Sequence, residues 1–321
     1  MVPMVRRLNV ASRRARRPSP VGSTAEIHEF PARAPDRTRR HRPKVLAIAN
    51  HKGGVGKTTV TLGLAEAAAA AGVRVGVIDL DPQADLTAVL HPRADEVAAG
   101  DYPSIESCLI SGSRTLAEVM GPSNWDGVDI VGAARTLAGI DPYLAQAEQR
   151  DPRARLRLRD QVLDLDLDLV LIDLQRSLSQ SGTVGLLASD GVLGVTELSS
   201  FSDRALTSLV TTVRSLSGWA EHVRMIGVAV NLAAQTREST RVAEALRAGW
   251  GPQLWEPFIP HRAVIKESYT AYRSKLRDFG TAQARAVSQI FDGYHVTATA
   301  ALDKAIKQQD KANTHHDKGA Q

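Results

Sequence analysis

Residues 44–59 read KVLAIANHKGGVGKTT, an apolar run followed by a glycine-rich loop with two lysines and the start of a helix. The almost uninterrupted apolar run from Val45 to Ala49 is typical of a parallel strand that helices cover on both faces. Glycines in the following loop let the backbone curl with its amide groups turned inward, so an anion can approach closely. The stretch therefore predicts a strand–loop–helix unit that binds phosphate.

Three further features of this stretch point to a nucleotide. Lys57 supplies a cation for β and γ phosphates, Thr58 offers a hydroxyl to Mg²⁺, and the helix that begins near Thr59 directs its positive dipole end at the same place. A turn without a ligand is the alternative, which the convergence of these features disfavours. The predicted nucleotide-binding residues are Lys52, Gly53, Gly54, Val55, Gly56, Lys57, Thr58 and Thr59.

The loop departs from the general phosphate-loop pattern G-x-x-x-x-G-K-[ST], because His51 stands at the first glycine and Lys52 leads the string KGGVGKT. This string resembles the deviant Walker A motif of the ParA and MinD superfamily. The resemblance implies that Lys52 reaches across a dimer interface to the partner's nucleotide. It makes Lys52 and Lys57 catalytic candidates.

The segment after the next predicted strand, residues 73–79, carries a second resemblance. It reads DLDPQADLT, similar to the family's DxDPQGNxT, with Ala84 and Asp85 in place of the usual Gly and Asn. The resemblance implies that Asp81 orients or activates the attacking water and that Asp79 helps to hold the water shell of the metal. Helix capping is the ordinary alternative for such an aspartate pair.

A third carboxylate, Asp173, ends the apolar strand 169–172 and resembles the Walker B aspartate that holds a Mg²⁺-bound water. The predicted metal set is therefore Thr58, Asp79 and Asp173. The family continues this strand as DxPPS, whereas Gln175 and Arg176 stand here in place of the prolines, which puts the hydrolysis rate in question. The alternating Asp164, Asp166 and Asp168 are better explained as a solvated approach to the strand than as a metal cluster.

Further apolar runs at 128–131, 191–195 and 225–230, with helices at 205–216 and 281–306, extend the alternation of strands and helices. This pattern predicts an α/β fold with a doubly wound, mostly parallel sheet flanked by helices. By resemblance, Asn231 lies near the nucleotide base and Pro260 packs beside it. A strand-end cap and a turn are the alternatives for these two residues.

Composition sets the domain organisation. The single cysteine, Cys108, excludes a disulfide framework or a cysteine-ligated cluster within one chain, and no apolar run has the length of a transmembrane helix. We predict a cytoplasmic protein with a basic, disordered arm over 1–43, one ATPase domain over 44–306, and a polar, disordered tail over 307–321. The tail lacks the apolar face of a membrane-binding helix, so no membrane partner is expected.

Positive charge is concentrated at the N-terminus. Residues 1–44 contain 12 Lys and Arg against three acidic residues, a net charge of +9, while the whole chain carries +5. Such a segment is suited to bind nucleic-acid phosphates, although a passive solvated extension is the alternative. The DNA-binding candidates are Arg13, Arg14, Arg16, Arg17, Arg39 and Arg40 in the arm and Arg237, Arg241 and Arg262 by resemblance; a solvated basic surface explains the last three equally well.

These features resemble a ParA-type partition ATPase. The resemblance implies slow, partner-stimulated ATP hydrolysis with Mg²⁺, an ATP-dependent homodimer, DNA binding without sequence preference, a ParB-like centromere-binding partner, and association with the nucleoid. Two alternatives stay open: a positioning ATPase for a protein cargo, and a nucleotide-switch regulator that hardly hydrolyses ATP. An iron protein of the nitrogenase type would need cysteines that this chain lacks.

Overall fold

The computed structural model describes residues 42–110, 113–176 and 179–319, in which an eight-stranded sheet runs in the order β3-β4-β2-β5-β1-β6-β7-β8. Its pairings are parallel except for that of β3 with β4, so the predicted doubly wound α/β fold is confirmed. The strands are β1 (Lys44–Ala49), β2 (Val75–Leu80), β3 (Gly121–Pro122), β4 (Val128–Val131), β5 (Leu169–Leu174), β6 (Gly191–Thr196), β7 (Met225–Val230) and β8 (Leu254–Trp255).

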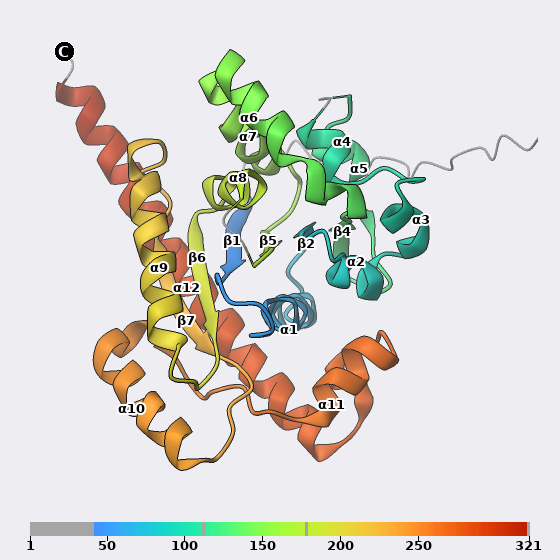
Figure 1. Cartoon of the computed structure of the whole chain (residues 1–321), viewed down its shortest axis with the longest axis vertical. Helices are drawn as coiled ribbons and strands as arrows, with labels where there is room; N and C mark the ends of the chain where they lie inside the picture. The colour runs from blue at the N-terminus through green and yellow to red at the C-terminus, as the bar shows by residue number, and fades with distance from the viewer. Residues whose placement is uncertain (1–41, 111–112, 177–178, 320–321) are drawn as a thin grey trace, which may run out of the picture.

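Helices cover both faces of the sheet (Figure 1), with α1 and the long α12 on one face and the group from α4 to α8 on the other. The α-helices are α1 (Lys57–Ala70), α2 (Asp85–Leu90), α3 (Ala94–Ala99), α4 (Ile105–Leu109), α5 (Leu116–Val119), α6 (Asp141–Arg150), α7 (Arg157–Leu163), α8 (Gln180–Ala188), α9 (Ser202–Ser215), α10 (Arg237–Trp250), α11 (Ala263–Lys266) and α12 (Ala282–Gly319).

The apolar run of β1 divides between two cores. Leu46 and Ile48 pack into the cluster beneath α1 and α12, while Val45 and Ala47 pack into the cluster on the opposite face. Successive side chains of a strand point to opposite faces, so a strand buried on both sides needs apolar residues at every position. The strand therefore brings the glycine loop rigidly to the carboxyl edge of the sheet, where β2 and β5 also end.

Helix α12 packs directly on α1. Gly63 leaves room for this contact, because a Cβ built there would lie 2.4 Å from the ring of Phe291. The polar segment predicted as a disordered tail over 307–321 differs in the structure, since α12 continues as helix to Gly319. Ala, Lys and Gln in this segment favour helix, the preceding turns of α12 are already docked, and no proline interrupts the helix.

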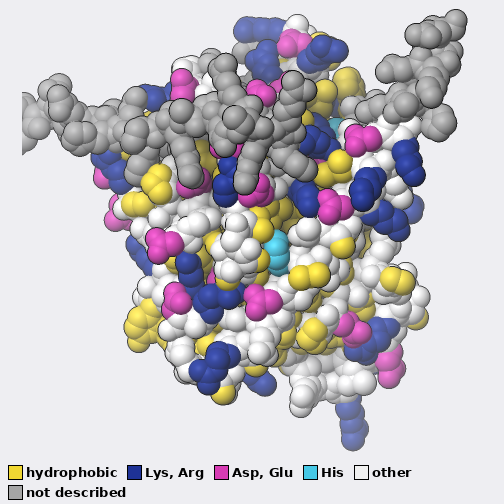
Figure 2. Space-filling model, turned by 180° about the vertical axis from the view of Figure 1, so that it is seen from behind, with side chains coloured by type: hydrophobic (Ala, Val, Ile, Leu, Met, Phe, Trp, Pro, Cys, Tyr) yellow, Lys and Arg dark blue, Asp and Glu magenta, His cyan; other side chains and the backbone are white. Residues whose placement is uncertain are grey.

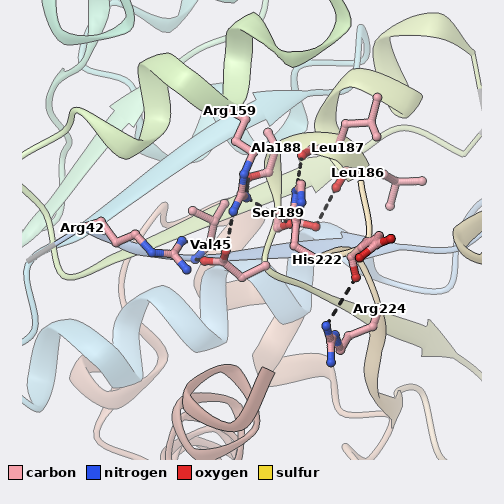
Figure 3. Close-up of polar contacts among 11 residues, drawn as sticks. Arg42, Val45, Arg159, Leu186, Leu187, Ala188, Ser189, His222 and Arg224 are labelled. Carbon is pink, nitrogen blue, oxygen red and sulfur yellow. Dashed lines mark hydrogen bonds and ion pairs between the residues drawn. The ribbon is translucent and has the colours of Figure 1, made fainter. Parts of the chain in front are cut away.

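The amino end of β1 is fixed by a buried carboxylate. Asp190 accepts hydrogen bonds from Arg42 (2.8 Å), from the amide of Val45 (2.9 Å) and from Arg159 (3.0 Å), the last two buried. Figure 3 shows Arg42 and Arg159 converging on this point from different elements. Because β1 runs from here to the glycine loop, residues 1–41, which lie outside the described part, join the domain at the edge of the sheet opposite that loop.

Candidate active site

The glycine loop forms an open anion cradle. Gly54 and Gly56 have φ of 78° and 87°, and a Cβ on Gly56 would lie 2.0 Å from Nδ2 of Asn231, so both positions need glycine. Helix α1 begins at Lys57 with neither a side-chain cap nor an acidic residue in its first turn. Its first amide groups are therefore available to a bound anion.

Two asparagines hold the loop in shape. Asn50 donates to the carbonyl of Val195 (2.5 Å) and accepts from the amide of Lys52 (2.9 Å), and Asn231 donates to the carbonyl of Val55 (3.0 Å). The sequence placed Asn231 at this site by resemblance but did not single out Asn50. An asparagine at the junction of a strand and a glycine loop was the available signal, because its amide can bond to nearby backbone.

Lys57 lies inside the cradle and is 7 % exposed. Burial lowers the pKa of its ammonium, while the charges of Asp173 and Asp81 act in the opposite direction and Arg176 adds to the lowering. A partly desolvated lysine interacts strongly with a bound polyanion such as a chain of phosphates. The structure thus brings Lys57, Asp81 and Asp173 together, as the sequence predicts.

Asp173 faces the first turn of α1. Its Oδ2 accepts a hydrogen bond of 2.6 Å from the hydroxyl of Thr58, while its Oδ1 is buried without a hydrogen-bond partner among the described residues. Burial, and secondarily the charge of Asp79, raise the pKa of Asp173 to about 8, which the Thr58 hydrogen bond partly offsets. A buried carboxylate oxygen that lacks a hydrogen-bond partner and lies beside a threonine hydroxyl is suited to bind a cation.

Asp79 differs from Asp173 in having both oxygens occupied. It accepts from the amide of Asp81 (3.0 Å) and from the amide and hydroxyl of Thr87 (2.9 and 2.6 Å), which ties the end of β2 to α2. Burial raises the pKa of Asp79 to about 7, against these hydrogen bonds. The carboxylate of Asp81 accepts a hydrogen bond from the amide of Gln83 (2.9 Å), and its charge raises the pKa of Lys57.

A cavity of about 420 Å³ adjoins the loop at Gly54, Gly56 and Thr59. Asn231 and His261 line it, as do residues between Arg262 and Thr270. Pro260, which pairs with Ala233 in an isolated bridge, is not among the lining residues. The Oδ1 of Asn231 is buried and has no partner among the described residues. A planar ligand with a polar edge could fill this cavity while its phosphates lie in the cradle.

The wall of this cavity is fastened to α1 by Glu66, which the sequence alone did not single out. The buried carboxylate of Glu66 accepts from the amides of Leu276 (2.8 Å) and Arg277 (2.7 Å) and from the hydroxyl of Tyr269 (3.2 Å). Glu66 is a single charged residue in an otherwise apolar stretch of helix, and this could have indicated a buried carboxylate with polar partners. Glu66 thus holds the wall of this cavity in place beside the phosphate loop.

Comparisons with known proteins agree with this geometry. A family model described as "AAA domain" matches residues 43–225, more than half of the chain. The chromosome-partitioning ATPase Soj of Thermus thermophilus is 31% identical over 231 residues, covering 71% of this chain and 86% of Soj. The chromosome partitioning protein ParA of Caulobacter vibrioides is 29% identical, covering 70% and 83%. The chain belongs to the ParA-type P-loop ATPases.

The fold of this ParA-type chain is similar to that of proteins with solved structures. A plasmid partition protein from Borrelia burgdorferi, crystallised with AMPPNP, superposes with a TM-score of 0.65 at 19% identity, covering 79% of this chain and 98% of that one. The similarity concerns the fold. It agrees with the strand order and the parallel pairings described above.

The segment after Asp173 departs from the ParA-type pattern. Gln175 donates to Ser179 and to Ser181 (3.0 Å), and Ser181 in turn donates to Asp141 (3.2 Å). A polar network thus joins Gln175 to the start of α8, where the family has a rigid proline pair. The next residue, Arg176, extends towards the phosphate loop.

The ParA-type site suits a Mg²⁺ ion that arrives with a nucleotide. No group of three or more His, Cys, Asp or Glu that could hold a metal occurs within residues 42–110, 113–176 and 179–319. Mg²⁺ usually keeps several waters and takes only one or two protein ligands beside substrate phosphates. The Thr58 hydroxyl and the free oxygen of Asp173 fit that need, and Asp164, Asp166 and Asp168 do not: Asp166 and Asp168 pair with Arg74 instead.

The DNA-binding candidates fall into separate places. Arg13, Arg14, Arg16, Arg17, Arg39 and Arg40 lie outside the described residues. Arg237 and Arg241 line a groove of about 580 Å³ between α9 and α10 together with Asp203 and Glu238, whereas Arg262 lines the cavity beside the phosphate loop. On the face shown in Figure 2, Lys and Arg are interspersed with Asp and Glu.

Proposed function

We propose that this chain is an ATP-dependent partition ATPase, which hydrolyses ATP slowly until a partner stimulates it. It dimerises on ATP, binds DNA without sequence preference, and moves a plasmid or chromosome with a ParB-like centromere-binding protein. The names of its relatives ParA and Soj support this proposal. The observation that carries it is the Thr58–Asp173 pair, with an unpartnered carboxylate oxygen, beside Lys57 and the uncapped start of α1.

Each residue of the site has a task in this proposal. The loop amides of residues 52–59 and the ammonium of Lys57 bind the phosphates, and Thr58 and Asp173 hold Mg²⁺, with Asp79 fixing the loop behind them. Mg²⁺ would neutralise phosphate charge when bound. Asp81 orients the attacking water, and Lys52 of one subunit meets the nucleotide of the other. Catalysis rests on positioning and charge stabilisation.

The base would occupy the cavity between the loop and α11, where Asn231 belongs to the lining and Pro260 directly precedes the lining residue His261. The unpartnered Oδ1 of Asn231 can accept a hydrogen bond from an exocyclic amino group, which adenine carries. Glu66 would keep the cavity wall aligned with the phosphates. We extend the expected ATPase domain of residues 44–306 to start at Arg42, which bonds to Asp190, and treat the arm before it as an addition.

DNA binding would use two surfaces. The basic arm supplies sequence-independent contacts to phosphate, and Arg237, Arg241 and Arg262 supply further contacts whose number doubles in a dimer. Within the described residues no helix is long and apolar enough to cross a membrane. We place the protein in the cytoplasm, associated with the nucleoid through DNA.

A second candidate function is a nucleotide-switch regulator with little turnover. The Gln175–Ser179–Ser181 network favours it, because this network replaces the proline pair that follows the Walker B aspartate in the family. Turnover measured with and without a partner protein separates the two functions. A partition ATPase is stimulated, whereas a switch stays slow.

The proposal is tested by binding and turnover in three variants of the full chain. Lys57→Ala should lose nucleotide binding, because it removes the buried cation of the cradle. Asp81→Ala should keep ATP affinity within about threefold but lose turnover by about 100-fold, the usual scale for a group that assists proton transfer. Gln83→Ala, a neighbour with an exposed side chain, is the control. A parent chain that binds no nucleotide, or an Asp81→Ala variant with normal turnover, would contradict it.

A further inference from the structure

Arg176 lies over the outer wall of the phosphate loop. Its segment leaves β5, which ends at Leu174, and a Cβ built on Gly53 would lie 3.1 Å from Cδ and 3.4 Å from Nη1 of the arginine. The stem of Arg176 therefore packs on the bare backbone of Gly53. Any larger residue at position 53 would have to displace it.

The guanidinium of Arg176 is a cation without a counter-charge of its own. The residue is exposed, and among the described residues it takes part in no hydrogen bond or ion pair. Its positive charge lowers the pKa of Lys57, so the two cations act on the same space. Two like charges held at the mouth of one cradle destabilise each other until an anion separates them.

The position of Arg176 indicates which part of a ligand it would reach. Arg176 follows Asp173 by three residues, and Asp173 is bonded to Thr58 at the metal side of the cradle. The base cavity adjoins the other side of the loop, at Gly54, Gly56 and Thr59. A nucleotide whose base fills that cavity extends its last phosphate towards Asp173 and Arg176.

We propose that Arg176 is a same-chain cation for the terminal phosphate of a bound nucleoside triphosphate, so that it distinguishes the triphosphate from the diphosphate. This inference rests on the proposed function and deepens it. A guanidinium can give two parallel hydrogen bonds to phosphate oxygens, which a lysine cannot. The residue that replaces the second proline would thereby add a charge to the site.

The test compares Mg²⁺-ADP with Mg²⁺-AMPPNP by calorimetric titration of the full chain. In Arg176→Ala, we expect AMPPNP affinity to fall about tenfold or more, as for loss of a charge-assisted hydrogen bond, and ADP affinity to change less than about threefold. Arg176→Gln keeps part of the stem and should behave like Ala, while Arg176→Lys should be intermediate. Arg150→Ala, at an exposed arginine of α6, is the control and should leave both affinities unchanged.

The outcomes separate this inference from the proposed function. A parent chain that binds neither ligand overturns the proposed function and this inference with it. A parent chain that binds both, with an unchanged ratio of the two affinities in Arg176→Ala and Arg176→Gln, overturns only the role of Arg176. An equal loss for both ligands also overturns it, because the arginine would then support the loop and not the terminal phosphate.

Discussion

The ammonium of Lys52 forms an ion pair with the carboxylate of Glu197, which joins the phosphate loop to the residue that follows β6. The Nζ of Lys52 also lies 3.3 Å from the hydroxyl of Ser199. Lys52 is the lysine that the proposed dimer presents to the nucleotide of its partner. Within one chain, Glu197 therefore competes with that dimer for Lys52.

Glu197→Gln should strengthen ATP-dependent dimerisation, since it releases Lys52 without shortening the side chain. The pair is 36% and 27% exposed, and such pairs contribute at most about 1 kcal/mol each. A symmetric dimer breaks two of them, so the dimer affinity should rise by no more than about 30-fold. Light scattering with ATP over a range of protein concentrations measures the change. Glu221→Gln, at an exposed position remote from the phosphate loop in the chain, is the control; weaker dimerisation in Glu197→Gln would mean that Glu197 supports the dimer.

The stability of the ligand-free chain should fall as pH rises, because burial raises the pKa values of Asp173 and Asp79 to about 8 and about 7. The unfolded chain has ordinary pKa values near 3.8 for these groups, so the folded state binds more protons between about pH 4 and 8. The stabilisation is complete below that window and is lost as pH passes through the folded pKa values. An aspartate in a salt bridge has the opposite effect: its pKa is lowered on folding, so its contribution to stability grows as pH rises.

Asp173→Asn isolates this effect, because the amide carries no charge at any pH of the window. The unfolding free energy of the parent minus that of the variant should decrease from pH 5 to pH 9 in urea titrations without nucleotide. The variant should also lose most of the stabilisation that Mg²⁺-ATP gives to the parent. A difference independent of pH would show that Asp173 is ionised throughout this window in the folded state, so that its pKa is not raised.

Alanine substitution at two glycines of the packed helices α1 and α12 should have opposite effects on stability. Gly63→Ala places a methyl 2.4 Å from the ring of Phe291 and should destabilise the chain by about 1–3 kcal/mol. Gly293→Ala, in α12 with open space around it, should stabilise by about 0.5–1 kcal/mol, since alanine favours helix. Thermal unfolding checks both, and equal effects would mean that α12 does not rest on Gly63.

The sequence alone predicted the phosphate loop and the parallel strands β1, β2, β4, β5, β6 and β7, but not the two-residue β8, because the signals of the longer strands are local. A strand such as β1, apolar at every position from Val45 onward, and a loop such as residues 52–58 need no distant partner to be recognised. Strand ends indicated Asp79, Asp81 and Asp173 for the same reason: parallel strands bring their carboxyl ends to one edge.

Several contacts around the phosphate loop join residues that lie far apart in the sequence. Motif spacing along the chain could not predict them. Glu66 meets the segment at 269–277, Lys52 meets Glu197, and Arg176 meets Gly53 only because the sheet order places β5 and β6 on either side of β1. The helical continuation to Gly319 was missed because the polar composition after residue 306 offers no apolar face from which a helix could be recognised. Tertiary context decided these features.

DNA binding has two candidate surfaces at opposite ends of the sheet. The arm joins the domain at Arg42, which is held by Asp190 at the amino edge, while Arg262 borders the base cavity at the carboxyl edge. A truncation should therefore start after residue 41, since Arg42 belongs to the folded domain. It removes ten arginines without touching the nucleotide site.

Deleting residues 1–41 should weaken binding to DNA of any sequence and flatten its salt dependence, while ATP-dependent dimerisation is kept. Removing one arginine–phosphate interaction changes the slope of log affinity against log salt by about 0.9. Fluorescence anisotropy at several salt concentrations, with and without ATP, measures both the affinity and the slope. A chain of full length with Arg13, Arg14, Arg16, Arg17, Arg39 and Arg40 changed to Gln separates charge from length. Unchanged affinity and slope in both would make the arm a passive extension, and binding that is indifferent to ATP in the parent would contradict the contribution of Arg237 and Arg241 in a dimer.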